Sequence, residues 1–238
     1  MKRILPGAAA LACAIAAAAP VAANAKTYEL GSSTVAATTS CPTDCFVVTK
    51  TTALEVATAG RNYPTTAPAN GSVVAFTLQL GSLSDKQIHF FNSTYGGTSR
   101  VAITVLHQTS DQRARRQFTV SAQSETVHIQ PFFGTTTTWP LATSLPVRKG
   151  DVIALTVQTW APILAVNLDK TNGWRASRAT GCRDLLTQTA QTTVGNMAQY
   201  KCLYQTARLM YTATEISTPV PPKQPTTTTT KPTTTTKK

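Results

Sequence analysis

The sequence predicts an all-β fold: an antiparallel β-sandwich that is jelly-roll-like and carries one long, disulfide-held loop excursion. Three observations predict it. Apolar and polar residues alternate with period two in one segment after another, which turns one face of each strand toward a core. These segments are rich in Val and Thr, which favour strands. Turn sequences such as Asn70-Gly71 and Gly96-Gly97 separate them, and there is little helical periodicity.

Residues 1–25 are predicted to be a secretory signal peptide. Two basic residues open the segment, and an alanine-rich apolar run follows from Ile4 to Ala23. Small residues occupy the two positions that a signal peptidase reads, Ala23 and Ala25. The mature chain is therefore expected to begin at Lys26. The protein is expected to be secreted or held at the cell surface, and to be extracytoplasmic in either case.

Two alternatives to cleavage are open. The apolar run could stay attached as a membrane helix, although no stop-transfer cluster of charges follows it. Cys13 could instead be lipidated, but the run continues past this residue, whereas a lipidated cysteine should end it. Beyond the leader, no apolar stretch approaches the roughly 20 residues needed to cross a bilayer. No transmembrane segment is therefore expected after cleavage.

The strands of the predicted sandwich lie in a domain of residues 26–216. Alternation is clearest where Phe76, Leu78 and Leu80 share one face of a segment. Strand cores are expected at 46–48, 73–80, 101–105, 118–120, 127–129, 153–157, 163–166 and 207–213. Many short strands with one polar face each are typical of a β-sandwich, most closely a jelly roll.

The stretch from Thr159 to Gln205 departs from this pattern. It contains Trp160, Trp174 and two cysteines, and it shows little alternation after Leu168. We expect a long loop excursion at one end of the sandwich, in which only Arg183–Thr193 has a weakly helical pattern. Long ordered loops often carry function.

Cysteine usage agrees with an oxidising destination. Removal of Cys13 with the leader leaves an even set: Cys41, Cys45, Cys182 and Cys202. Four cysteines allow three connectivities, and we favour the two nearest-neighbour pairs because each closes a turn-rich segment. A zinc site is the alternative to disulfides, but these spacings match no common zinc pattern, so no metal site is expected. No cofactor is expected either.

Residues 217–238 are predicted to be a disordered tail, because Thr, Pro and Lys alone cannot bury enough apolar surface to fix a fold. Six of the 22 basic residues lie in the leader and this tail, which leaves 16 against 10 acidic residues and a domain charge near +6. The cluster of Arg113, Arg115 and Arg116 is either a solvated loop or a contact for an anionic partner. Scattered charge, export and the lack of a recognition motif argue against nucleic acid.

Several strings of the domain, taken together, resemble a group of uncharacterised exported proteins of actinobacterial type. The clearest strings are Ser40-Cys41-Pro42, Phe90-Phe91-Asn92, Leu145–Asp151, Thr159–Pro162 and Trp174–Arg178. The likeness covers about Cys41 to Ile216. No activity is assigned to that group, so the resemblance implies an extracytoplasmic compartment and a β-sandwich and implies nothing about chemistry.

No catalytic signature is found in the sequence. A nucleophile elbow, a His-Glu-x-x-His helix and a phosphate-binding glycine loop are all lacking. His89, His107 and His128 fall on three separate candidate strands. The acidic residues are dispersed, which leaves open a pair of carboxylates brought together across sheets, as a glycosidase requires.

The tryptophans mark the candidate site. Exposed indoles can stack on sugar rings and an adjacent arginine can hold hydroxyl or carboxylate groups, although core filling is the alternative for each ring. Trp174, Arg175 and Arg178 have the least core-like context, so we take them as candidate ligand-binding residues, with Trp139 and Trp160 as alternatives. The sequence favours an exported, non-catalytic binding or cell-surface structural module for polysaccharide or cell-wall polymer over a secreted glycan hydrolase.

Overall fold

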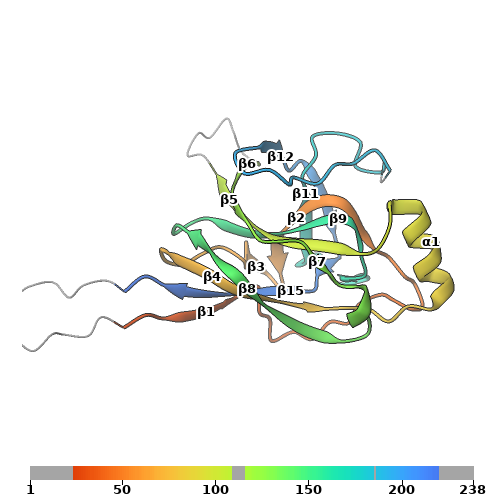
Figure 1. The fold of residues 1–238 in the computed structure, drawn as a ribbon, viewed down its shortest axis with the longest axis horizontal. Coiled ribbons are helices and arrows are strands. Elements are labelled where there is room, and N and C mark those ends of the chain that lie inside the picture. The colour runs from red at the N-terminus through yellow and green to blue at the C-terminus, as the bar shows by residue number, and fades with distance from the viewer. Residues whose placement is uncertain (1–23, 109–115, 185, 220–238) are drawn as a thin grey trace, which may run out of the picture. The chain divides into compact units, whose positions relative to one another are not determined.

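Two antiparallel β-sheets pack face to face in the unit Ala25–Thr218 (Figure 1). The structure is a computed structural model that describes residues 24–108, 116–184 and 186–219. The predicted signal peptide, residues 1–25, and the predicted tail, residues 217–238, lie almost entirely outside the described residues, so both stay predictions. The last strand includes Ser217, just beyond the predicted end of the domain at Ile216.

The smaller sheet contains the first and last strands of the unit as neighbours. Its order is β1 (Thr27–Leu30), β15 (Tyr211–Ser217), β4 (Gly71–Gln79) and β8 (Thr136–Val147). Two hydrogen bonds of 2.8 Å join the ends of the unit: Lys26 N–H donates to Ser217 Oγ, and Ser217 N–H donates to the Lys26 carbonyl.

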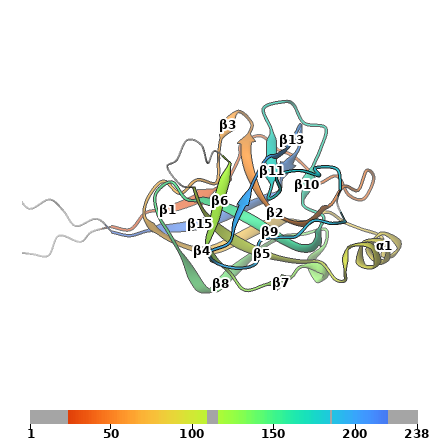
Figure 2. The same cartoon turned by 90° about the horizontal axis from the view of Figure 1, so that it is seen from above.

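The larger sheet is extended beyond a simple sandwich. Its order is β12 (Met197–Gln199), β6 (Gln117–Gln123), β5 (Arg100–Gln108), β9 (Val152–Ala161), β2 (Val48–Thr58), β11 (Gly173–Ala176) and β13 (Cys202–Gln205). Viewed from above, β11 lies beside β2, and β13 lies on the other side of β11 (Figure 2). The short strands are β3 (Arg61–Asn62) on β2, β7 (Val127–His128) on β5, and the separate ribbon of β10 (Leu164–Ala165) and β14 (Arg208–Leu209).

The topology is that of a jelly roll. Eight strands, β1, β2, β4, β5, β6, β8, β9 and β15, form the two facing sheets. Numbered one to eight along the chain, they lie in the orders 1-8-3-6 and 2-7-4-5, so each sheet alternates between early and late strands as a jelly roll requires. The fold class predicted from the sequence is confirmed.

The main core fills the space between the sheets, and a smaller core covers the outer face of the larger sheet. Phe76 and Leu78 of β4 meet Ile103 and Leu155 from the opposite sheet in the main core. The smaller core has Leu54, Leu106, Phe118, Val120, Val152, Ala154 and Tyr200. Both faces of β2 and β11 are buried, so burial does not alternate along them, and the sequence analysis predicted only Val48 of β2 and none of β11.

The predicted excursion is held by the Cys182–Cys202 disulfide, and the predicted Cys41–Cys45 disulfide is also present. The excursion is more regular than the sequence indicates, because it supplies β11, β12 and β13 to the larger sheet. Buried hydrogen bonds fasten Gln191 to the outer face of that sheet: its N–H donates to Thr52 Oγ1 at 3.0 Å, and its carbonyl accepts from Gln123 Nε2 at 2.9 Å. The described residues of Arg183–Thr193 form turns and bends, not a helix.

One α-helix, α1 (Asp85–Tyr95), lies at an end of the sandwich where the sequence analysis placed a strand (Figure 1). Ser84 and Gln87 form a capping box at its start, and Gly96 ends it in the left-handed conformation, with φ 88°. His89 therefore lies on an exposed helix face, which corrects its assignment to a strand. A 3₁₀ turn, η2 (Gln130–Phe132), precedes β8. No helix among the described residues is long and apolar enough to span a membrane.

Candidate functional site

Trp174, the centre of the predicted site, lies inside the larger sheet. The register of β11 puts it opposite Glu55 of β2 and Tyr204 of β13. Its indole stacks on the Tyr204 ring with 4.3 Å between centroids, and only 5% of the residue is exposed. The expectation of an exposed indole on a loop is therefore wrong. β11 is a buried strand of the sheet, so the ring contributes to the core.

Backbone carbonyls hold the two arginines of the predicted site. Arg175 donates from Nη1 to both carbonyls of Tyr200–Lys201, at 3.1 and 2.9 Å. Arg178 donates to carbonyls of the Gly181–Asp184 turn and lies 5.9 Å from the centroid of the Tyr204 ring. Burial lowers the pKa of both guanidinium groups. Both arginines thus brace the excursion, and of the two only Arg178 approaches the aromatic pair.

A pocket of about 420 Å³, which we name the Phe46 pocket, opens beside Trp174. Phe46 is 57% exposed, Tyr204 is half-buried, and Asn167 and Gln205 add amide groups. The Cys41–Cys45 and Cys182–Cys202 disulfides flank this pocket. Cys45 directly precedes Phe46, and the Tyr204 hydroxyl donates to the Cys182 carbonyl at 2.6 Å. Two covalent links therefore restrain the walls that carry the rings.

The other two tryptophans pack as structural residues. Trp160 is fully buried, and its Nε1 donates to Asn92 Oδ1 and to the Gly97 carbonyl at 3.1 and 3.0 Å. Trp139 is half-buried and stacks on Phe76 with 5.5 Å between centroids. Trp160 therefore offers no open face for a sugar, and one face of Trp139 is covered by Phe76.

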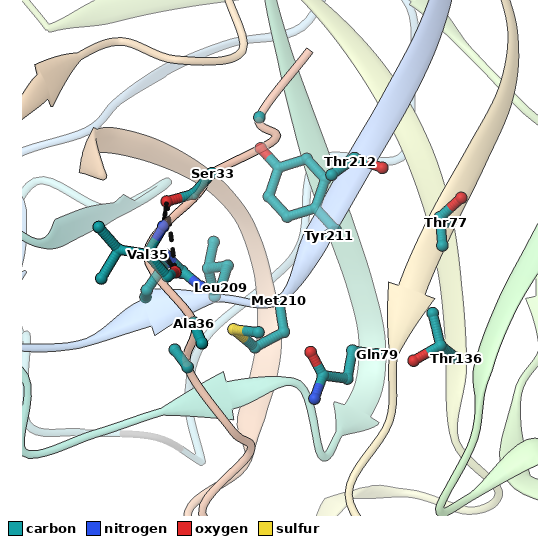
Figure 3. Close-up of a pocket in the computed structure, with 13 residues that line it drawn as sticks. Ser33, Val35, Ala36, Thr77, Gln79, Thr136, Leu209, Met210, Tyr211 and Thr212 are labelled. Atoms are coloured by element: carbon teal, nitrogen blue, oxygen red, sulfur yellow. Dashed lines mark hydrogen bonds between the residues drawn. The ribbon is translucent and has the colours of Figure 1, made fainter. Parts of the chain in front are cut away.

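A second pocket, about 340 Å³, lies between the smaller sheet and the segment that follows β1 (Figure 3). In Figure 3, Ser33 and Ala36 of that segment face Met210 and Gln79 across the opening. Hydroxyl, amide and apolar groups mix in the wall with the guanidinium of Arg208, and the described residues that line it include no carboxylate or imidazole. The composition suits a polar ligand, and the one phenol in the wall, that of Tyr211, donates its proton to the Ile153 carbonyl at 2.8 Å.

A third pocket, about 370 Å³, is named the end pocket and lies where β5 and β6 meet the turn between β8 and β9. His107 Nδ1 lies 2.7 Å from Asp151 Oδ1; the two side chains are 45% and 4% exposed. Thr119 and Ser121 of β6 and Arg148 of the turn also line it. The end pocket therefore gathers an imidazole, a buried carboxylate and two hydroxyl groups.

Glu55 is a buried carboxyl that lines none of these three pockets. Glu55 is 1% exposed, accepts from Leu209 N–H, and accepts from Thr58 Oγ1 at 2.9 Å. Desolvation raises its pKa to about 8, because the two hydrogen bonds and the charge of Arg208 offset only part of the cost of burying a carboxylate. Glu55 is therefore a structural group whose contribution to the free energy of unfolding depends strongly on pH.

Fold and disulfides define the molecule as a disulfide-linked jelly-roll domain. No protein-family model, curated protein or solved structure matches this chain. Within residues 24–108, 116–184 and 186–219, no group of three or more His, Cys, Asp or Glu side chains is placed to hold a metal ion. Of the predicted arginine cluster, Arg116 is exposed, and Arg113 and Arg115 lie outside the described residues.

Sequence reasoning missed both the Phe46 pocket and the end pocket. It assigned Phe46 to a strand, whereas the residue precedes β2 and is exposed. It noted His107, but nothing in the sequence relates this residue to Asp151, 44 positions away along the chain. Only the pairing of β5 with β9 brings them together.

Proposed function

We propose that this protein is an exported binding module that takes a polysaccharide or cell-wall polymer in the Phe46 pocket. The observation that carries the proposal is an exposed aromatic ring on walls restrained by both disulfides. A rigid aromatic platform binds with little loss of conformational entropy, which is the advantage of pre-organisation. Jelly rolls include lectin, capsid and cupin domains, so the fold is compatible with this function without selecting it.

The chemistry of the Phe46 pocket suits a sugar. The exposed ring of Phe46 supplies an apolar face for the C–H groups of a pyranose, and Asn167, Gln205 and Thr206 supply neutral hydrogen-bonding groups for its hydroxyls. A volume of about 420 Å³ lies in the range of small-ligand sites. The half-buried Tyr204 contributes its edge, since Trp174 and Arg178 pack on the ring.

Export is the first part of the proposal to test. Cells that express the full chain are expected to release a protein that begins at Lys26, because Ala23 and Ala25 fit the positions read by a signal peptidase. Intact-mass analysis of the culture supernatant measures this directly. Ala25→Lys should block release and serves as the control. A released protein that retains Met1, or one lipidated at Cys13, would contradict the assignment.

Phe46→Ala should weaken binding to an insoluble glycan or cell-wall fraction about tenfold. Removal of a stacking ring costs on the order of 1 kcal/mol beyond the area it covers, and 1.4 kcal/mol corresponds to tenfold in Kd. Phe90→Ala is the matched control, because Phe90 is 56% exposed and lies on α1, outside the Phe46 pocket. Depletion assays on purified peptidoglycan, cellulose, chitin and xylan measure both variants beside the unmodified protein.

The outcome is read from the difference between the two variants. Weakened binding in Phe46→Ala alone supports the Phe46 pocket. Equal binding by the unmodified protein and Phe46→Ala overturns the assignment of the pocket. Equal losses in both variants would mean that any exposed ring adheres to the matrix. Thermal melts of both variants should match the unmodified protein, since an exposed ring makes few core contacts.

A further inference from the structure

We propose that the end pocket is a catalytic site for acyl transfer, in which His107 and Asp151 activate the Ser121 hydroxyl to hydrolyse short-chain carboxylic esters. The proposal is independent of the Phe46 pocket, which shares no lining residue with the end pocket. It rests on the orientation of the His107–Asp151 pair, on the position of Ser121, and on the shape and charge of the cavity.

The Asp151 carboxylate is fixed before any substrate arrives. Oδ2 accepts a hydrogen bond from the backbone N–H of Arg148 at 2.9 Å, and the backbone N–H of Asp151 donates to the Arg148 carbonyl at 3.0 Å. The backbone carbonyl of Asp151 accepts from Ala67 N–H at 2.8 Å. The turn between β8 and β9 therefore holds the carboxylate in one orientation, with Oδ1 directed at His107.

This contact decides which nitrogen of His107 can act as a base. A carboxylate only accepts hydrogen bonds, so the 2.7 Å contact assigns the proton of the neutral imidazole to Nδ1. Nε2 then keeps its lone pair, and 45% of the side chain is open to the pocket and solvent. An imidazole oriented by a buried carboxylate through one nitrogen and free at the other is the arrangement that deprotonates a hydroxyl in Ser-His-Asp triads.

Ser121 is presented by an irregularity in the neighbouring strand. The register pairs His107 with Thr119 but shifts between Val105 and Leu106, which leaves Ser121 as the extra residue of a β-bulge. Bulges redirect side chains beside functional sites. The Ser121 hydroxyl donates to the Val105 carbonyl at 3.2 Å. The proposed reaction requires a turn about χ1 of Ser121 that exchanges this bond for one to His107 Nε2. Thr119 is half-buried and β-branched, which makes its hydroxyl the poorer nucleophile.

The rest of the cavity defines the substrate class. Pro146 and Val147 form an apolar wall, and about 370 Å³ accommodates a short acyl chain. Arg148 is exposed and lines the cavity, so its guanidinium is the cation that can stabilise the oxyanion of a tetrahedral intermediate. These features favour a small ester, such as an O-acetyl group on a larger molecule, over a long-chain lipid.

The reaction needs only water as co-reactant. Ser121 Oγ forms a bond to the acyl carbon while its proton passes to His107 Nε2. The ester C–O bond then breaks, and the Nε2 proton goes to the leaving alkoxide. Water next loses a proton to Nε2 and attacks the acyl carbon, and Ser121 leaves with that proton. The products are a carboxylic acid, an alcohol and the unchanged protein.

The test uses the full secreted chain, p-nitrophenyl acetate and a fluorophosphonate reagent. Asp151→Asn and Ser121→Ala should each lower kcat/KM on the order of 10³- to 10⁴-fold. In Asp151→Asn the amide oxygen can still accept from Arg148 N–H, while the amide N–H places the imidazole proton on Nε2, so the turn is kept and the base is lost. Ser121→Ala removes an exposed hydroxyl and should not affect folding. Peptide mass spectrometry should find the phosphonate on Ser121, and His107→Ala should abolish that adduct.

Controls separate catalysis from the slow reaction of any exposed imidazole with this ester. His128→Ala changes an exposed histidine outside the end pocket and should leave kcat/KM unchanged. An adduct on Thr119 would overturn the assignment of Ser121 as nucleophile. Full activity in Ser121→Ala, or equal losses in His107→Ala and His128→Ala, would overturn the catalytic site. An unmodified protein that binds glycan but does not hydrolyse the ester would overturn the end pocket alone. An unmodified protein that hydrolyses the ester but does not bind glycan would overturn the Phe46 pocket alone.

Discussion

Replacing Glu55 by Gln is expected to stabilise the protein at pH 8 by several kcal/mol and to change its stability little at pH 5. Burial raises the pKa of this carboxyl to about 8 in the folded state, above the value near 4.5 of an exposed glutamate. Between these two values the folded protein keeps a proton that the unfolded chain releases. The free energy of unfolding therefore falls as pH rises through this window. The limiting slope is about 1.4 kcal/mol per pH unit, and the total is up to about 5 kcal/mol.

Glutamine keeps the shape of the protonated side chain and has no proton to lose. Its amide oxygen can still accept from Leu209 N–H, and its amide nitrogen can contact the Thr58 hydroxyl as a donor. Urea unfolding at pH 5, 6.5 and 8 measures the effect. Glu29→Gln, at an exposed residue of β1, makes the same change of charge without burial and is the control. A Glu55→Gln protein that is less stable than the unmodified one at pH 8 would mean that the carboxylate is stabilised by Arg208.

The strands that could be predicted from the sequence are those in which large apolar side chains alternate with small or polar ones. β5 and β9 are among them, although both of their faces are buried. β4 and β15 show the period-two pattern in sequence and in burial. β2 and β11 could not be found in this way, because β2 contains the polar run Thr49–Thr52 and β11 is only 4 residues long, too short to show a pattern. α1 was missed for a different reason. Its apolar pair Phe90-Phe91 suggests a strand, whereas the capping box of Ser84 and Gln87 was the signal that marks a helix.

The nearest-neighbour disulfides could be predicted because they depend on short loops, while the pockets depend on sheet pairing. The Phe46 pocket needs β13 to lie beside β11, and the end pocket needs β9 to lie beside β5. Both are non-local contacts, and β11 and β13 carry no pattern in the sequence that specifies their place in the sheet. Tryptophan context alone therefore led to Trp174, which is near the Phe46 pocket but belongs to the core.

Trp174→Ala is expected to cost about 3–5 kcal/mol, because it empties a large volume between β2 and β13. The ring is 5% exposed and stacks on Tyr204, so its loss also removes one support of the Phe46 pocket. Weaker glycan binding by this variant could result from unfolding as well as from the loss of a contact with the ligand. Phe46 is therefore the residue to test for binding. Chemical denaturation of the purified variant, or its yield in the culture supernatant, measures the loss of stability.

Trp174→Phe separates the contribution of the ring from that of the indole nitrogen. Nε1 of Trp174 is buried and has no hydrogen-bond partner among the described residues, so the indole carries the cost of an unsatisfied donor. Phenylalanine keeps an aromatic ring against Tyr204 and removes that donor. The variant is therefore expected to lie within about 1.5 kcal/mol of the unmodified protein, since the lost volume and the removed donor oppose each other. A Trp174→Ala protein that loses less than about 1 kcal/mol would contradict the buried position of the ring and restore Trp174 as an exposed binding residue.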